Sequence, residues 1–127
     1  MDIIVTTPKT EIANAAAEAS HVIAQGGGEY FRYIGPYKPL STRVGNGIWY
    51  VEDGFIRGFA IITRIVCVDA QQCSTTGREF RPGWYVYSRA ESWKWIRPIP
   101  MKGFQGWRYY DGPGEVIGQW RDPRPVV

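Results

Sequence analysis

Histidine and cysteine are scarce in this chain, which limits the chemistry that it can carry out. The 127 residues include one histidine, His21, and two cysteines, Cys67 and Cys73. Two cysteines cannot form a framework of several disulfides, and a structural zinc ion usually needs four cysteine or histidine ligands. We therefore expect no Cys67–Cys73 disulfide, no metal, no cofactor and no histidine-based triad, in a reducing, cytoplasmic setting. Cys67 lies in an apolar run and is expected to be buried, whereas Cys73 is expected in an exposed loop.

Long hydrophobic runs are also lacking. No apolar stretch approaches the roughly 20 residues that span a bilayer, and residues 1–6 lack the basic region and apolar stretch of a signal peptide. We therefore expect no membrane partner. The content of 44% hydrophobic and 21% charged residues excludes a disordered chain. A chain of this length buries about two-thirds of its unfolded surface, so residues 1–127 are expected to form one domain.

Aromatic residues, glycine and proline are abundant by contrast. The chain has six tryptophans, eight tyrosines, 15 glycines and nine prolines. Aromatic residues favour strands, and glycine and proline favour turns. Only residues 8–25 show apolar residues at helical spacing, with Thr7 as the expected N-cap and Pro8 in the first turn. These features predict many short strands and a single helix.

The expected fold is mainly β (α+β): a small curled β-barrel of five to seven strands with one N-terminal helix. Asp53 and Gly54 predict a tight hairpin turn. The strand that follows, residues 55–68, is long and apolar on both sides, and Gly58 predicts a bulge or bend in it. Such a strand is typical of a small barrel. The segments with strand character are residues 2–7, 29–34, 48–52, 55–68, 84–89, 92–99, 107–110 and 115–120.

Positive charge is concentrated in the second half of the chain. The net charge is +3, and 11 of the 15 basic residues are arginines. Residues 78–110 hold seven basic and two acidic residues, and residues 94–110 hold no acid. Such a block favours an anionic partner, although a solvated basic face would have the same composition.

Tryptophans alternate with the basic residues of this block. Aromatic rings stack on bases, and arginine and lysine hold phosphates, so the pattern predicts a cleft that binds RNA, single-stranded DNA or a modified base. Trp95 and Trp107 are expected to stack, and the basic residues to hold phosphate. Alternatively, these tryptophans fill the core of a small barrel. The expected nucleic-acid-binding residues are Arg57, Trp95, Arg97, Lys102, Trp107 and Arg108.

Three segments carry a resemblance to a known superfamily. They are VGNGIWYV (residues 44–51), GFIRGFA (54–60) and RPIPMKG (97–103). They resemble short conserved segments of the PUA-like superfamily, which includes the ASCH and EVE-type domains. The order of one strand, a helix and then a run of strands is also similar. The resemblance implies a PUA-like pseudobarrel that acts as a non-enzymatic module for binding RNA or a modified nucleotide.

Two other functions remain open. Some ASCH enzymes hydrolyse an amide of a modified nucleoside with a lysine, a threonine and a glutamate. Gly35, Lys38, Thr42 and Arg43 resemble that motif in residue type but not in spacing. In this alternative, a small amidohydrolase or ribonuclease would use Lys38, Thr42 and Glu52, although a basic loop between strands explains the same residues. In the other alternative, the aromatic surface binds a protein, as in an inhibitory domain of a phage or mobile element.

Overall fold

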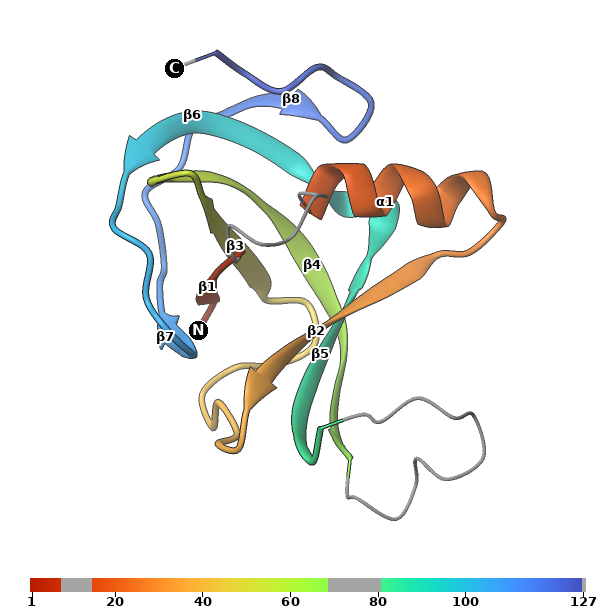
Figure 1. Cartoon of the computed structure of the whole chain (residues 1–127), viewed down its shortest axis with the longest axis vertical. Coiled ribbons are helices and arrows are strands. Elements are labelled where there is room, and N and C mark those ends of the chain that lie inside the picture. The colour runs from red at the N-terminus through yellow and green to blue at the C-terminus, as the bar shows by residue number, and fades with distance from the viewer. Residues whose placement is uncertain (8–14, 69–80, 127) are drawn as a thin grey trace.

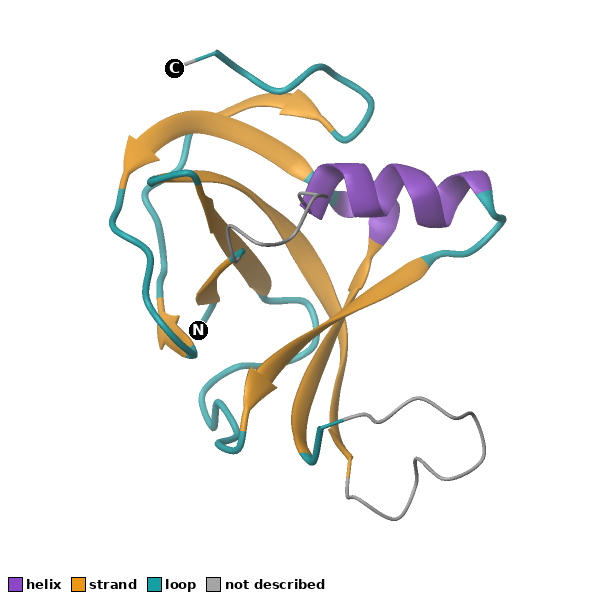
Figure 2. Cartoon of the chain, in the orientation of Figure 1, coloured by secondary structure: helices purple, strands orange, loops and turns teal. Residues whose placement is uncertain are grey.

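A computed structural model describes residues 1–7, 15–68 and 81–126. The chain is mainly β, with 49% of residues in strands and 11% in helices (Figures 1 and 2). One α-helix is present in this part of the chain, and no described helix has the length and apolar character needed to cross a membrane. The elements are β1 (Ile3–Thr6), α1 (Ala15–Ala24), β2 (Glu29–Gly35), β3 (Gly47–Glu52), β4 (Phe55–Val68), β5 (Gly83–Arg89), the short 3-10 helix η2 (Ala90–Ser92), β6 (Lys94–Pro100), β7 (Trp107–Tyr109) and β8 (Val116–Gln119).

The predicted mainly β fold with one N-terminal helix is confirmed. Helix α1 lies within the predicted range of 8–25, but its expected start at Pro8 falls outside the described residues. The eight strands exceed the predicted five to seven. Strands β7 and β8, of three and four residues, fall within the expected segments 107–110 and 115–120, so the excess is in the predicted number and not in the location of the strands.

The strands form one sheet with an open order. That order is β2-β5-β4-β3-β1-β7, and β6 joins it by pairing with β4 and β8. Strand β1 pairs in parallel with β3, whereas the other pairs are antiparallel. The sheet is not closed into a barrel: β2 and β7 end the order and do not pair with each other among the described strands.

Strand β4 bends as expected and contacts three neighbours. Its first half pairs with β3 and β6, and its second half pairs with β5. The register with β6 shifts between Ile56 and Gly58, so the predicted bend at Gly58 is confirmed. The hairpin before it is also confirmed, because Asp53 and Gly54 both have positive φ, at 52° and 79°.

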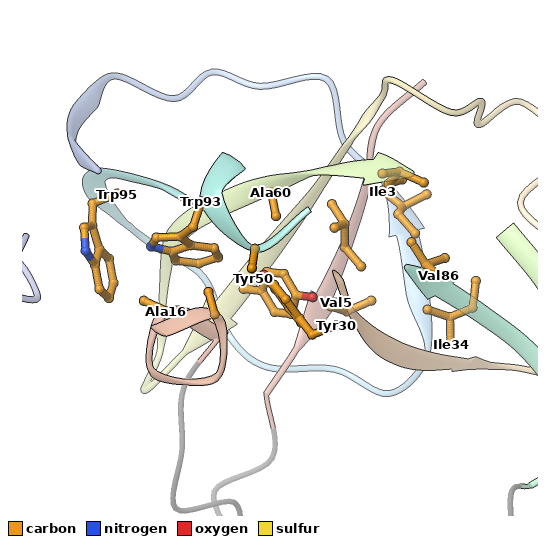
Figure 3. Close-up of a cluster of buried hydrophobic side chains, with 14 residues drawn as sticks. Ile3, Val5, Ala16, Tyr30, Ile34, Tyr50, Ala60, Val86, Trp93 and Trp95 are labelled. Atoms are coloured by element: carbon orange, nitrogen blue, oxygen red, sulfur yellow. The ribbon is translucent and has the colours of Figure 1, made fainter. Parts of the chain in front are cut away.

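Two hydrophobic clusters stabilise the sheet. The larger one lies between the sheet and α1, where Ala16 and Ala19 let the helix approach Trp93 and Tyr30 closely (Figure 3). The smaller one contains Ile4, Trp49, Val51, Ile56 and Ile96. Because Ile3 and Val5 belong to the larger cluster, β1 is buried on both faces.

The prediction that Cys67 is buried is wrong. Cys67 is a free, exposed thiol near the end of β4, opposite the half-buried Trp84 of β5. There β4 pairs with β5 and extends away from α1 (Figure 1), so the apolar run continues beyond the core. The expected exposure of Cys73 concerns a residue outside the described part of the chain.

Replacement of Gly58 by alanine is expected to destabilise the fold strongly. A Cβ atom there would lie 2.2 Å from the Lys94 carbonyl oxygen and 2.6 Å from a ring carbon of Trp93. Overpacking of this kind costs about 1–3 kcal/mol of unfolding free energy. Gly28→Ala is the control, because no atom lies within 4 Å of its Cβ. Urea unfolding should show a lower midpoint for Gly58→Ala alone; equal midpoints would contradict the observed packing.

Exposure of Cys67 is open to chemical measurement. In a Cys73→Ser variant, the remaining thiol should react with a disulfide reagent such as DTNB about as rapidly in the native protein as in urea, because it is not covered. The measurement is the absorbance of the released aryl thiolate with time. A thiol that reacts only after unfolding would contradict the placement of β4.

Candidate functional site

A cleft of about 950 Å³ lies between the two ends of the strand order. One wall comes from the end of β2 and the turn after it, and the other comes from residues 104–107, which lead into β7. Strands β2 and β7 do not pair with each other. The cleft lies in the gap between them, which we call the seam; backbone pairing would fill this gap if the sheet were closed. The lining residues are Thr6, Arg32, Tyr33, Ile34, Gly35, Pro36, Tyr37, Arg81, Phe104, Gln105, Gly106 and Trp107.

Thr6, the last residue of β1, joins the two walls. Its carbonyl oxygen accepts a hydrogen bond from the guanidinium of Arg32 on β2. Its hydroxyl oxygen accepts a hydrogen bond from the backbone N–H of Phe104, at 3.1 Å. The side chain also lies so close to Gly103 that a Cβ there would be 3.0 Å from the Thr6 methyl group. One residue of a buried strand therefore sets the position of Arg32 relative to the opposite wall.

Four aromatic side chains line the cleft. The indole N–H of Trp107 donates to the carbonyl oxygen of Tyr37 at 3.1 Å, which links the two walls a second time. Tyr109 packs edge-on against the Trp107 ring, with the ring centroids 4.9 Å apart. Tyr37 is 76% exposed, and Trp107 is half-buried, so both rings are accessible. Tyr33 and Phe104 are the other two lining rings.

The charge of the cleft is positive. Arg32 and Arg81 line it, and among the described residues no carboxylate does. The guanidinium of Arg81 lies 5.7 Å from the centre of the Tyr33 ring, and that of Arg108 lies 4.2 Å from the centre of the Phe104 ring. Neither Arg81 nor Arg108 forms an ion pair within the described residues. The ion pairs there join Arg64 to Glu29, Arg89 to Glu91, Arg97 to Glu115 and Arg124 to Asp53.

Buried tyrosines near Arg32 add no negative charge. Burial raises the pKa of Tyr50 well above its ordinary value, although the nearby Arg32 acts in the opposite direction. Burial also raises the pKa of Tyr30. Both hydroxyls therefore remain protonated at neutral pH and add no charge beside Arg32.

Half of the expected nucleic-acid-binding residues lie in or next to this cleft. Trp107 lines it, Arg108 stacks on the lining Phe104, and Lys102 is exposed two residues before Phe104. The cleft therefore combines the C-terminal part of the basic block with β2. The other expected residues, Arg57, Trp95 and Arg97, lie elsewhere.

The expected surface position of Trp95 is wrong. Its side chain is 2% exposed, and its indole N–H donates to the carbonyl oxygen of Asp122 at 3.1 Å. Trp93 lies on the same face of the chain, and the two rings meet edge to face at 5.3 Å. Both rings belong to the larger core cluster near α1 (Figure 3). The alternative in which the tryptophans fill the core is therefore correct for this pair.

The side chains of Arg57 and Arg97 form hydrogen bonds or an ion pair with other residues of the protein. Arg57 is 6% exposed, so its expected position on a binding surface is also wrong. Its guanidinium donates to the carbonyl oxygens of Glu52 and Pro125, at 3.3 and 3.4 Å. Arg97 is exposed, but its Nε lies 2.8 Å from the carboxylate of Glu115. Neither side chain lines the cleft.

The three residues of the hydrolase alternative are not brought together. The Thr42 hydroxyl donates to the Met1 carbonyl oxygen at 2.7 Å, whereas the Glu52 carboxylate accepts from the Thr7 hydroxyl at 3.1 Å. Met1 and Thr7 flank opposite ends of β1, about 20 Å apart at about 3.3 Å per residue. The third residue, Lys38, is exposed, with its ammonium 5.2 Å from the centre of the Trp84 ring.

The sequence patterns did not identify the β2 side of the cleft. Arg32 lies between the buried Tyr30 and Ile34 on the inward face of β2, a position usually held by an apolar residue. This charged residue within the apolar face of β2 is the sequence feature that could have indicated a functional arginine. Tyr33 and Arg81 had no comparable signal, because they approach each other only through the pairing of β2 with β5.

Comparison with known proteins adds no relative to this description: no family model, curated protein or solved structure matches the chain. Within residues 1–7, 15–68 and 81–126, no three histidine, cysteine, aspartate or glutamate side chains form a group able to hold a metal ion.

The two tryptophans should differ in their effect on stability. Trp95→Ala removes a buried ring and its hydrogen bond, and is expected to lower the free energy of unfolding by about 3–5 kcal/mol. Trp107→Ala removes a half-buried ring at the cleft and is expected to cost no more than about half as much. Chemical denaturation followed by circular dichroism measures both changes. A larger loss for Trp107→Ala would contradict these positions.

Proposed function

We propose that this chain is a PUA-like module that binds RNA or single-stranded DNA, without catalysis, in the cleft between β2 and β7. The observation that carries the proposal is the lining of the cleft, which consists of two arginines, four aromatic side chains and, in the part of the chain that the structure describes, no carboxylate. A nucleotide combines a planar, stackable base with an anionic phosphate. This lining complements both of those features.

Each part of the cleft has a distinct role in the proposal. Trp107 and Tyr37 offer rings to a base, and Arg32 and Arg81 offer guanidinium groups to a phosphate. Arg108 and Lys102 add charge on the β7 side. The volume lies near the upper end of the roughly 300–1,000 Å³ typical of ligand pockets, which leaves room for one nucleotide or one modified base.

The open strand order supports the PUA-like part of the proposal. A curled barrel would bring β2 and β7 side by side, and the cleft lies between residues of these two strands. We propose that the sheet is such a barrel with its seam left open for the ligand. The seam would then give base edges access to backbone groups of both strands.

Salt dependence should separate the charged contacts from the stacking contacts. For a fluorescently labelled single-stranded oligonucleotide, affinity should fall as salt rises, because bound phosphates release counterions. The double variant Arg81→Gln/Arg108→Gln should weaken binding and flatten the slope of log K against log salt by about 1.4, or about 0.7 per phosphate contact. Trp107→Ala should weaken binding about 5- to 150-fold with the slope unchanged. Fluorescence anisotropy at several salt concentrations measures both quantities.

Arg121→Gln is the matched control for these charge changes. Its guanidinium also lies over a ring, 5.3 Å from the centre of Trp120, and neither residue lines the cleft. The affinity and salt slope of Arg121→Gln should change only by the small amount expected when any one positive charge is removed from the surface. An Arg121→Gln effect equal to that of an Arg81→Gln single variant would contradict the cleft. So would the absence of salt-dependent binding at protein concentrations of about 100 µM.

A further inference from the structure

Four aromatic rings form a continuous row across β2 and β5, and three of them lie outside the cleft. Tyr87 contacts Phe31 at a ring-centroid distance of 5.8 Å, and Phe31 contacts Tyr85 at 5.7 Å. Tyr85 contacts Tyr33 at 5.2 Å. Planes of neighbouring rings meet at angles between 47° and 65°, so the rings are tilted or edge-on to one another. We call these four residues the ring row.

An arginine lies at each end of the ring row. The guanidinium of Arg64, on β4, is 4.0 Å from the centre of the Tyr87 ring. The guanidinium of Arg81 is 5.7 Å from the centre of the Tyr33 ring. Glu29 pairs with Arg64 at 3.4 Å, which holds that guanidinium above the sheet. A row of rings with a guanidinium group at each end fits bases and phosphates, because a base can stack on a ring or a guanidinium and a phosphate can pair with the guanidinium.

The ring row lies on the face of the sheet opposite the core. Side chains alternate between faces along a strand, and Tyr30, Ile34 and Val86 point into the larger cluster (Figure 3). Phe31 and Tyr87, at the intervening positions, therefore point outward. Phe31 is 42% exposed, which is unusual for a phenylalanine in the middle of a paired strand.

The row and the cleft are continuous. Tyr33 and Arg81 belong to the end of the row and also line the cleft. Tyr85 is only 4% exposed, so it connects the rings of Tyr33 and Phe31 without offering a face of its own. A chain that leaves the cleft past Tyr33 would therefore meet the accessible rings of Phe31 and Tyr87 next. Because Tyr33 and Arg81 belong to both surfaces, a ligand chain bound in the cleft would continue along the ring row.

We propose that the ring row stacks the nucleotides that flank the one held in the cleft, so that the ligand is a single strand of several nucleotides and not an isolated nucleotide. This rests on the proposed function of the cleft. Single-strand binding surfaces commonly combine stacking rings with cations along the strand, at site sizes of about 4–16 nucleotides. A double helix would not present its bases to such a row, because they are stacked inside it.

The test compares a dinucleotide with a strand of about twelve nucleotides of the same composition. The wild-type protein should bind the long strand at least about tenfold more tightly. Phe31→Leu keeps an apolar side chain but removes the ring, and Arg64→Gln removes the guanidinium. Each should weaken binding of the long strand by about 5- to 100-fold and leave binding of the dinucleotide unchanged. Calorimetric titration suits the weak dinucleotide, and anisotropy suits the long strand.

Two control variants make the same chemical changes away from the row. Phe55→Leu removes a half-buried ring that lies near the guanidinium of Arg57, and Arg124→Gln breaks the exposed pair with Asp53. Both should bind both ligands as the wild type does. Because a long strand offers more binding registers to any protein, the effect of each variant relative to wild type decides the outcome.

The failures of the two proposals are distinguishable. If Phe31→Leu and Arg64→Gln bind the long strand as the wild type does, the ring row is a packing feature or binds a different class of partner, such as a protein, and this inference is overturned while the cleft stands. If they weaken both ligands equally, they act through the cleft and the inference is again overturned. If the wild type binds neither ligand, the proposed function fails and the inference fails with it.

Discussion

The whole site depends on the burial of β1 in the sheet. This four-residue strand is buried on both faces, with Ile3 and Val5 in one cluster and Ile4 in the other. It pairs with β3 on one side and β7 on the other, and thereby brings the C-terminal part of the chain beside β2. Thr6 then bonds to Arg32 on one wall of the cleft and to Phe104 on the other. Hydrophobic burial of three residues therefore fixes the distance between an arginine and the wall that faces it.

The cleft and the ring row follow from one property of the sheet, its open order. Closure would pair β2 with β7 and fill the seam with backbone hydrogen bonds. Instead, the inward face of β2 supplies Arg32 to the seam, and its outward face carries Phe31. Tyr33 and Arg81 belong to both surfaces, so a single strand could pass from one to the other. Arg89, Arg97 and Arg124 are held in ion pairs elsewhere on the surface, whereas Arg81 and Arg108 are in none among the described residues.

Local patterns in the sequence predicted local structure well. The turn at Asp53 and Gly54, the bend at Gly58 and the single helix all depend on residues close together in the chain. The candidate site was predicted only on its β7 side, through Trp107 and its basic neighbours. Its β2 side depends on pairings between distant segments, which no local pattern encodes. Trp95 illustrates the limit: alternation places it on the same face of the chain as Trp93, just before β6, but only the packing of α1 and Asp122 decides that this face is buried.

Photochemical cross-linking shows whether a single strand occupies the cleft between β2 and β7. A single-stranded oligonucleotide carrying 5-iodouracil would be bound to the full chain and irradiated, and the modified residues would be located by peptide mass spectrometry. The account predicts adducts at Trp107, Tyr37 or Tyr33, the accessible rings of the cleft. Adducts confined to aromatic residues outside it, such as Trp120 or Phe55, would contradict the account.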